Sequence, residues 1–173
     1  MSKLTPDAQV PALSLPLVGG GTWTLADQKP KHFTMIVVYR GYHCPVCKAY
    51  LTKLNTLVDM ANEAGVTVVA ASMDPQERAE KTKEEWGLDN LDIAYGLSRD
   101  DVRNWGLYFS TSIKEAENEE FAEPGLFWVR PDGRLYLVDI SNMPWPRPDV
   151  EFLLSKVGFA MENNYPARGT ATP

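Results

Sequence analysis

The sequence predicts an α/β fold in which a central mixed β-sheet carries helices on both faces. Residues 34–39 and 66–72 are short apolar runs rich in β-branched side chains, a pattern typical of strands buried on both faces. A helical pattern follows each run, so the two strands are expected to be parallel. Residues 126–130 and 134–140 flank a Pro-Asp-Gly turn and are expected to form an antiparallel hairpin, which makes the sheet mixed.

The remaining elements are arranged around this sheet. Residues 12–18 and 22–27 are expected to form an N-terminal β-hairpin extension, and residues 93–97 a short strand. Amphipathic patterns and capping residues, with Asp74 as one expected N-cap, predict helices at residues 45–64, 74–86, 98–107 and 149–163.

Two segments are expected to lack regular structure. Residues 109–123 read as an exposed acidic loop, since they contain five glutamates: Glu115, Glu117, Glu119, Glu120 and Glu123. The tail over residues 165–173 is rich in Gly, Pro and Thr and is expected to be poorly ordered. The chain is thus expected to form a single domain over 1–173, with 1–11 and 165–173 as terminal extensions.

Composition narrows the class of protein. The chain has 173 residues, enough for one domain with a proper core, and a net charge of −6 with both signs interspersed. This balance argues against a nucleic acid or an anionic membrane as partner. No apolar run approaches the roughly 20 residues of a membrane span, and residues 1–6 lack the apolar core of a signal peptide. A cytoplasmic location is expected.

Both cysteines of the protein lie in one Cys-x-x-Cys motif, Cys44-Pro45-Val46-Cys47, directly after the predicted strand at 34–39. Pro45 suits the first position of a helix, because its missing N–H would have no partner there. Cys44 is then the expected N-cap and Cys47 the third helical residue.

An N-cap position favours the thiolate. Its sulfur can accept hydrogen bonds from free backbone N–H groups and faces the positive end of the helix dipole. Together with the second thiol, this could bring the thiol pKa from about 8.5 towards about 7. We therefore assign Cys44 as the attacking thiol and Cys47 as the partner that closes the disulfide. Two sulfurs too far apart to bond without refolding, or placed mid-helix and sealed off from solvent, would contradict this assignment.

A zinc site and an inert buried pair are the alternatives to a redox-active cysteine pair. In a reducing compartment, cysteines at this spacing are either catalytic or metal-binding more often than structural. Zinc needs about four ligands, and only His32 and His43 are available beside the thiols. An inert buried pair is the remaining alternative. We expect no metal and no cofactor.

Four neighbours are candidates for shaping the site. His43 is either a proton donor and, when charged, a thiolate stabiliser, or an exposed turn residue. Arg40 either aims positive charge at the site or simply ends the strand. Trp145 and Arg147, in a Pro-rich loop, either form one rim of a substrate groove or only pack.

Several stretches resemble the peroxiredoxin-like branch of the thioredoxin-like superfamily, the alkyl hydroperoxide reductase/thiol-specific antioxidant (AhpC/TSA) family. The similarity extends from about Ala12 to Phe159. The matching stretches are Trp23-Thr24-Leu25-Ala26-Asp27, Cys44-Pro45-Val46-Cys47-Lys48, Ala71-Ser72-Met73-Asp74-Pro75, Val102-Arg103-Asn104-Trp105-Gly106-Leu107, and Gly125-Leu126-Phe127-Trp128-Val129 with Pro131-Asp132-Gly133. The resemblance implies a thioredoxin-like fold and a redox-active disulfide.

The site departs from the family pattern. Peroxiredoxins have a Thr or Ser three residues before their attacking Cys and a Pro four residues earlier still. If Cys47 took the attacking position, those places would hold Cys44 and Arg40. The distant Arg that polarises the peroxide should fall where this chain has Pro124, the place at which thioredoxins carry a cis-Pro packed against the disulfide. Pro124 is therefore either a cis-Pro wall of a thioredoxin-like site on a peroxiredoxin-like body or an ordinary proline at the start of a strand, and the register before Gly125 favours the cis-Pro wall.

The resulting function is that of a thiol-based antioxidant oxidoreductase. Cys44 and Cys47 would cycle between dithiol and disulfide, reducing disulfides or other oxidised thiols, with a thioredoxin- or glutathione-type reductant as partner. One alternative is a peroxiredoxin-like thiol peroxidase that reduces hydroperoxides. The other is a non-enzymatic redox-sensing module that docks through the acidic segment at 115–123. The sequence leaves oligomerisation open.

Overall fold

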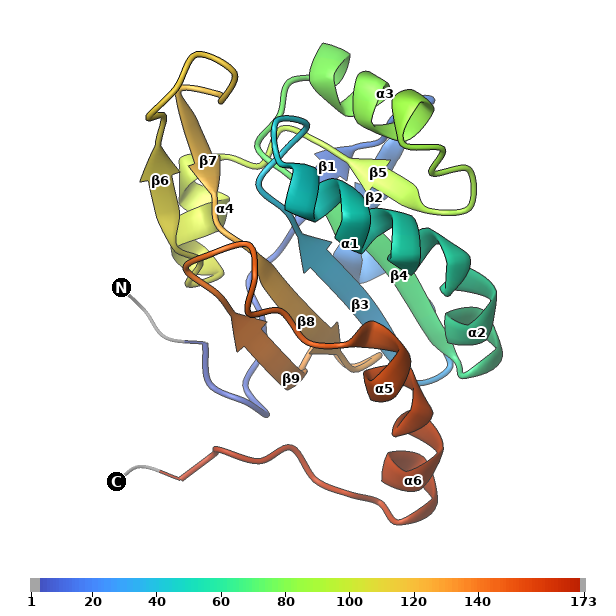
Figure 1. Ribbon diagram of the computed structural model, residues 1–173. Helices are drawn as coiled ribbons and strands as arrows, with labels where there is room; N and C mark the ends of the chain where they lie inside the picture. Colours follow the sequence, from blue (N-terminus) through green and yellow to red (C-terminus); the bar gives the residue numbers. More distant parts are fainter. Residues whose placement is uncertain (1–3, 172–173) are drawn as a thin grey trace.

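The computed structural model describes residues 4–171 and confirms the mixed sheet (Figure 1). Five strands form the sheet, in the order β5 (Asp92–Ala94), β4 (Val66–Ala71), β3 (Phe33–Val38), β8 (Gly125–Val129) and β9 (Leu135–Ile140). β3, β4 and β5 are parallel, whereas β8 is antiparallel to both β3 and β9. All six residues of the central strand β3 are buried, as its unbroken apolar sequence predicts.

Helices cover both faces of this sheet. They are α1 (Pro45–Thr56), α2 (Val58–Glu63), α3 (Gln76–Glu85), α4 (Arg99–Asn104), α5 (Val150–Ser155) and α6 (Val157–Glu162). Met35 and Val37 of β3 face one core cluster, which also contains buried residues of α1, α2, α3, α5 and α6. Ile36 and Val38 face a second cluster, to which α4 and the N-terminal hairpin contribute. The period-two alternation along β3 thus separates two hydrophobic cores.

Two small hairpins flank the central sheet. The expected N-terminal hairpin is present as β1 (Ser14–Pro16) and β2 (Thr22–Thr24), followed by a short 3₁₀ helix, η1 (Leu25–Asp27). The expectation of an irregular acidic loop over 109–123 is confirmed for residues 112–119 and wrong for the two segments that flank them. β6 (Phe109–Thr111) and β7 (Glu120–Ala122) pair as a second antiparallel hairpin. Two of the five glutamates, Glu117 and Glu123, are buried because both pair with Arg40.

Two helices expected to be continuous are interrupted. The first ends at Thr56 and α2 begins at Val58, because the N–H of Leu57 bonds Leu54 three residues back instead of continuing the helical ladder. The last helix is divided in the same way at Lys156. None of the helices between residues 4 and 171 combines the length and the apolar sequence needed to cross a membrane.

The described part of the C-terminal tail is more ordered than its composition predicts. The N–H of Tyr165 bonds the carbonyl of Ala160, and its own carbonyl accepts the hydroxyl of Tyr136 on β9. Ala167 is buried. These contacts fold residues 165–171 back towards the sheet edge, whereas residues 172 and 173 lie outside the described part of the chain.

Candidate active site

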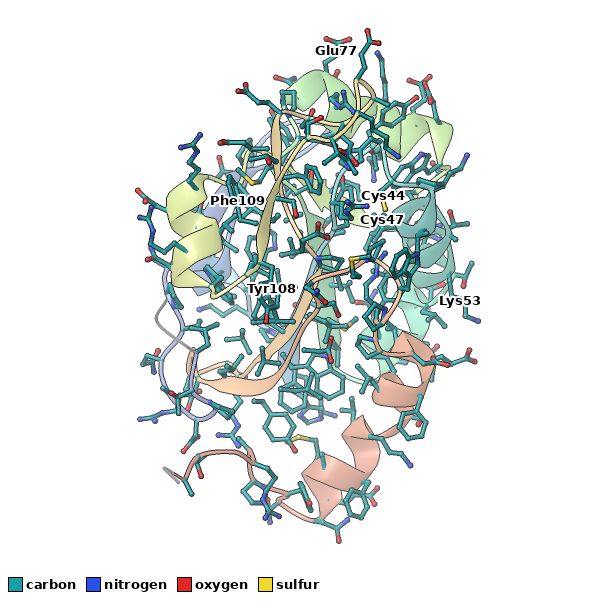
Figure 2. All side chains as sticks on the ribbon, turned by 60° about the vertical axis from the view of Figure 1, so that its left-hand side comes forward. Cys44, Cys47, Lys53, Glu77, Tyr108 and Phe109 are labelled. Carbon is teal, nitrogen blue, oxygen red and sulfur yellow. The ribbon has the colours of Figure 1, made fainter. Side chains whose placement is uncertain are left out.

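The two cysteines occupy the expected places at the start of α1 (Figure 2). Cys44 is the N-cap, with extended backbone (φ −99°, ψ 104°), and Pro45 is the first helical residue. The Cys44 Sγ accepts the backbone N–H of Cys47 at 3.2 Å. The sulfur of Cys44 thus takes the place of a capping oxygen and satisfies one of the free donors of the first turn.

Both thiols are free and buried, which differs from the expectation of an open site. Only 1% of Cys44 and 0% of Cys47 is exposed. They belong to the same core cluster as the inward face of β3. A bulky disulfide on another protein therefore has no route to either sulfur in this conformation, while a molecule the size of water or peroxide needs only a small opening.

The surroundings separate the pKa values of the two thiols. The pKa of Cys44 is lowered to about 6, chiefly by a hydrogen bond from the Cys47 thiol, with further contributions from the Cys47 backbone N–H, Arg40 and Arg147. Burial opposes this shift. The pKa of Cys47 is raised, first by burial and then by its bond to Cys44. Cys44 is the thiolate at neutral pH and Cys47 retains its proton.

Arg147 brings a guanidinium group directly to the thiol pair. Its Nη2 lies 3.2 Å from the Cys47 Sγ, and its guanidinium carbon lies 4.2 Å from the centroid of the Tyr50 ring. Its Nε donates to the carbonyl of Pro144 at 2.9 Å, while Nη1 is buried and has no hydrogen-bond partner among the described residues. A buried, unpaired donor on a guanidinium that contacts Cys47 can bind an oxygen atom that arrives there.

The loop that carries Arg147 is held in place from both sides. The hydroxyl of Tyr50 on α1 donates to the carbonyl of Pro148 at 2.7 Å, and Ser141 donates to the carbonyl of Pro146 at 2.7 Å. Trp145, in contrast, is 67% exposed. Of the two residues expected at a groove rim, only Arg147 reaches the cysteines.

Arg40 and His43 lie beside the pair, in the turn between β3 and Cys44. Arg40 is half-buried, and its positive charge contributes to the lowered pKa of Cys44. The ring of His43 packs against Phe121 of β7, with centroids 4.8 Å apart. Burial, and then the charge of Arg40, lower the pKa of His43 to about 4. His43 is therefore neutral at pH 7 and cannot be the charged thiolate stabiliser that was one of its expected roles.

Residues 6–138 match the AhpC/TSA family. The chain belongs to this family. Its fold is similar to a peroxiredoxin-like protein from Aquifex aeolicus, with 18% identity, coverage of 92% of this chain and 89% of the other, and a TM-score of 0.74. It is similar to peroxidoxin BcpB from Mycobacterium tuberculosis, with 14% identity, coverage of 90% and 97%, and a TM-score of 0.73.

The AhpC of Mycobacterium bovis is also similar to this AhpC/TSA chain, with 15% identity, coverage of 99% and 100%, and a TM-score of 0.74. Among curated proteins, none matches the sequence at a significant level. The structural likenesses show a peroxiredoxin-type thioredoxin-like fold, and family membership makes the chain a thiol-based redox enzyme.

One expectation for this AhpC/TSA site is wrong, because the peptide bond before Pro124 is trans. The chain runs extended from β7 into β8, and both flanking groups are paired: the N–H of Glu123 bonds the carbonyl of Tyr108 at 2.8 Å, and the carbonyl of Pro124 accepts the N–H of Ser141 at 2.9 Å. No reversal of direction requires a cis bond here. Pro124 still lines the same narrow space as Arg147.

The buried carboxylate of Asp74 stabilises the turn between β3 and Cys44, whereas the sequence predicts it as a helix N-cap. Asp74 was expected to cap the helix at 74–86, yet Pro75 is the N-cap, and the fully buried Asp74 side chain accepts the N–H of Tyr42 at 2.8 Å. Burial raises its pKa. Gly41, at φ +132°, makes room for it, because a Cβ there would lie 2.7 Å from the Asp74 Oδ1.

The acidic residues near the site form ion pairs and are not arranged as metal ligands. Within residues 4–171, no group of three or more His, Cys, Asp or Glu side chains is placed to hold a metal ion. The two sulfurs of Cys44 and Cys47 and the guanidinium groups of Arg40 and Arg147 lie close together at this site.

Proposed function

We propose that this AhpC/TSA enzyme reduces small hydroperoxides through Cys44 and Cys47. The observation that carries the proposal is a thiol whose pKa is lowered to about 6 while only 1% of its residue is exposed. Such a thiolate is strongly nucleophilic at neutral pH, and its burial admits a small oxidant in preference to a macromolecule. Disulfide reduction, the first expectation from sequence, fits this burial less well.

In the first step, the Cys44 thiolate attacks one oxygen of the O–O bond. The sulfur–oxygen bond forms as the O–O bond breaks, so Cys44 is oxidised to sulfenic acid and the hydroperoxide is reduced to an alcohol, or to water from hydrogen peroxide. The leaving oxygen departs with the electron pair and takes up a proton. The thiol of Cys47, which bonds Cys44, is one source of that proton, and solvent is the other.

In the second step, Cys47 attacks the sulfur of the Cys44 sulfenic acid. A sulfur–sulfur bond forms and hydroxide leaves, to be protonated to water. The two cysteines are three residues apart in one helical turn, so the second thiol is always close to the first. A thioredoxin- or glutathione-type thiol reductant then restores the dithiol by exchange.

Arg147 supports both steps by charge. Its guanidinium next to Cys47 favours the thiolate that Cys47 must become, and its unpaired Nη1 is available to the leaving oxygen. The family position for the peroxide-polarising arginine holds Pro124, and Arg147 brings the same chemical group from a different loop.

Disulfide reduction is a second candidate, favoured by the separation of the two thiol pKa values. A low pKa at the first cysteine and a raised pKa at the second suit attack on a disulfide followed by resolution. It would require the covering groups to move away from Cys44 before any protein substrate could reach it.

A stopped-flow competition separates the two functions. Reduced protein would be mixed in turn with hydrogen peroxide and with a small oxidised protein disulfide, and oxidation would be followed by tryptophan fluorescence. The proposal expects the peroxide rate constant to exceed the disulfide one by about 100-fold, because access is limited by size. Faster reaction with the disulfide would reject peroxide reduction as the main activity.

A further inference from the structure

The β6–β7 hairpin is tied to the turn that leads from β3 to Cys44 through Arg40. The Nε of Arg40 lies 3.1 Å from the Glu123 Oε2, and its Nη2 lies 3.9 Å from the Glu117 Oε1. The side chains of both glutamates are almost fully buried, at 2% and 5% exposure. The Arg40 guanidinium also lies over the ring of Phe121, 4.8 Å from its centroid.

A second anchor joins the hairpin to the other side of the same turn. The carboxylate of Asp74 accepts the N–H of Tyr42 through one oxygen and the side-chain amide of Asn118 through the other. Nearby, Arg78 Nη2 donates to the carbonyl of Ala116 at 2.8 Å. Asn118 thus reaches the turn through a buried carboxylate, independently of Arg40.

The hairpin also contacts His43, the residue before Cys44. His43 packs against Phe121, and both of its ring nitrogens are buried without a hydrogen-bond partner among the described residues. The next residue is Cys44, with 1% exposed. Two of the four turn residues, Arg40 and His43, thus contact the hairpin directly. The backbone of a third, Tyr42, is joined to the hairpin through Asp74. The hairpin therefore holds the segment that leads directly into the buried Cys44.

We propose that residues 116–123 of this hairpin set the size limit of the active site. With both anchors formed, the hairpin admits hydrogen peroxide and similarly small hydroperoxides and excludes bulky hydroperoxides and protein disulfides. Glu117 and Asn118 are then specificity-determining residues that act by holding the cover in place. The substrate assignment rests on the proposed function, whereas the covering of Cys44 rests on these contacts alone.

Thiol alkylation tests the cover without requiring any peroxidase activity. Reduced wild type and the variants Asn118→Ala and Glu117→Gln would be treated with iodoacetamide and with a fluorescein maleimide, and labelling of Cys44 would be timed by peptide mass spectrometry. Loss of the Asn118–Asp74 hydrogen bond, or of the Glu117 charge that faces Arg40, is expected to raise the bulky-reagent rate about tenfold and the iodoacetamide rate about twofold. Glu119→Gln, an exposed neighbour on the same segment, is the matched control and should label like wild type.

The substrate arm compares hydrogen peroxide with cumene hydroperoxide on the same proteins. In Asn118→Ala, the rate constant for hydrogen peroxide divided by that for cumene hydroperoxide should be about tenfold lower than in wild type. The reason is that the substitution changes access to Cys44 and leaves the chemistry unchanged. If no variant reduces any peroxide while the alkylation pattern is as expected, the proposed function fails and the cover stands. Equal labelling of wild type and Asn118→Ala by the bulky reagent overturns the cover.

Folding of the variants is checked by circular dichroism before labelling. If Glu117→Gln does not fold, Asn118→Ala carries the test, since its side chain is only half-buried. Hydrogen exchange on wild type gives a variant-free measurement. Slow exchange of the Glu123 and Ser112 amides, which bond the carbonyls of Tyr108 and Glu119, supports a closed hairpin, and exchange at the rate of an unfolded peptide overturns it.

Discussion

The Nη2 of Arg147 lies 3.2 Å from the sulfur of Cys47, across 100 residues of sequence. This contact places a fixed positive charge directly beside a buried sulfur. The arginine is held by the Tyr50 ring and the Pro144 carbonyl. A charge that is positioned before the reaction needs no reorganisation when negative charge develops on oxygen or sulfur.

Replacing Arg147 is expected to slow oxidation by peroxide. Arg147→Gln should lower the second-order rate constant about 100-fold, because both the charge and the unpaired donor are lost. Arg147→Lys keeps the charge but lacks the fork of donors, so a smaller loss is expected. Stopped-flow fluorescence with hydrogen peroxide measures both. A rate for Arg147→Gln within twofold of wild type would remove Arg147 from the mechanism.

The two cysteines are expected to have distinguishable roles. Cys44→Ser should abolish fast oxidation, since it removes the thiolate. Cys47→Ser should still react once and stop at sulfenic acid, which dimedone traps as an adduct on Cys44. Intact-mass spectrometry after one equivalent of peroxide reads both outcomes. An adduct on Cys47 in Cys44→Ser, formed at the wild-type rate, would reverse the assignment.

The pH dependence of oxidation follows from the lowered pKa of Cys44. Because the thiolate is the reactive form, the rate should rise with pH through about 6 and level off above about 7. His43, with a pKa lowered to about 4, is neutral throughout this range and adds no step above pH 5. Thiolate absorbance at 240 nm gives the same pKa independently. A midpoint near that of free cysteine would contradict the environment described for Cys44.

The same shift predicts how reduced Cys44 affects stability. The folded-state pKa lies below that of the unfolded thiol, so the stabilising contribution is present above the unfolded pKa and is lost as pH falls through about 6. The difference in unfolding free energy between wild type and Cys44→Ser should therefore shrink from pH 8 to pH 5. Urea titrations at the two pH values measure this difference, and its growth at low pH would be inconsistent with the sign.

Gly41 is expected to tolerate no side chain. Its φ of +132° is rarely adopted by other residues, and an added Cβ would lie 2.7 Å from the buried Asp74 carboxylate. Gly41→Ala should lower the free energy of unfolding by about 2 kcal/mol or more. Gly158→Ala is the control, because this helical glycine has no atom within 4 Å of the added Cβ. That substitution should be neutral or stabilising by about 0.5–1 kcal/mol.

Local rules were enough to predict the helix start at Cys44. The proline at the first helical position and the preceding buried strand are neighbours in sequence, and the resulting cap does not depend on the rest of the fold. The parallel strands, the β8–β9 hairpin and the mixed sheet follow in the same way from contiguous apolar patterns. The helix breaks at Leu57 and Lys156 leave the amphipathic pattern unchanged, so periodicity does not reveal them.

The groups that complete the site come from distant parts of the chain. Asp74 is a residue type and lies at a position typical of a helix N-cap. Only the folded structure shows that its carboxylate instead accepts hydrogen bonds from Tyr42 and Asn118. Glu117 and Glu123 read as solvated charges until Arg40 is brought to them. These pairings join segments that are distant in sequence, so the local sequence of one segment does not predict them. The analogy with thioredoxins predicts a cis bond before Pro124, whereas the bond is trans and Pro124 directly precedes β8.

The rate of oxidation of fully reduced protein by hydrogen peroxide, set against a free thiol of the same pKa, tests the central claim most directly. A rate constant about 100-fold or more above that of the free thiol, ending in a Cys44–Cys47 disulfide with one peroxide consumed per molecule, is expected from a preorganised site. A rate no higher than that of the free thiol would show that the buried thiolate and Arg147 do not form a peroxidase site.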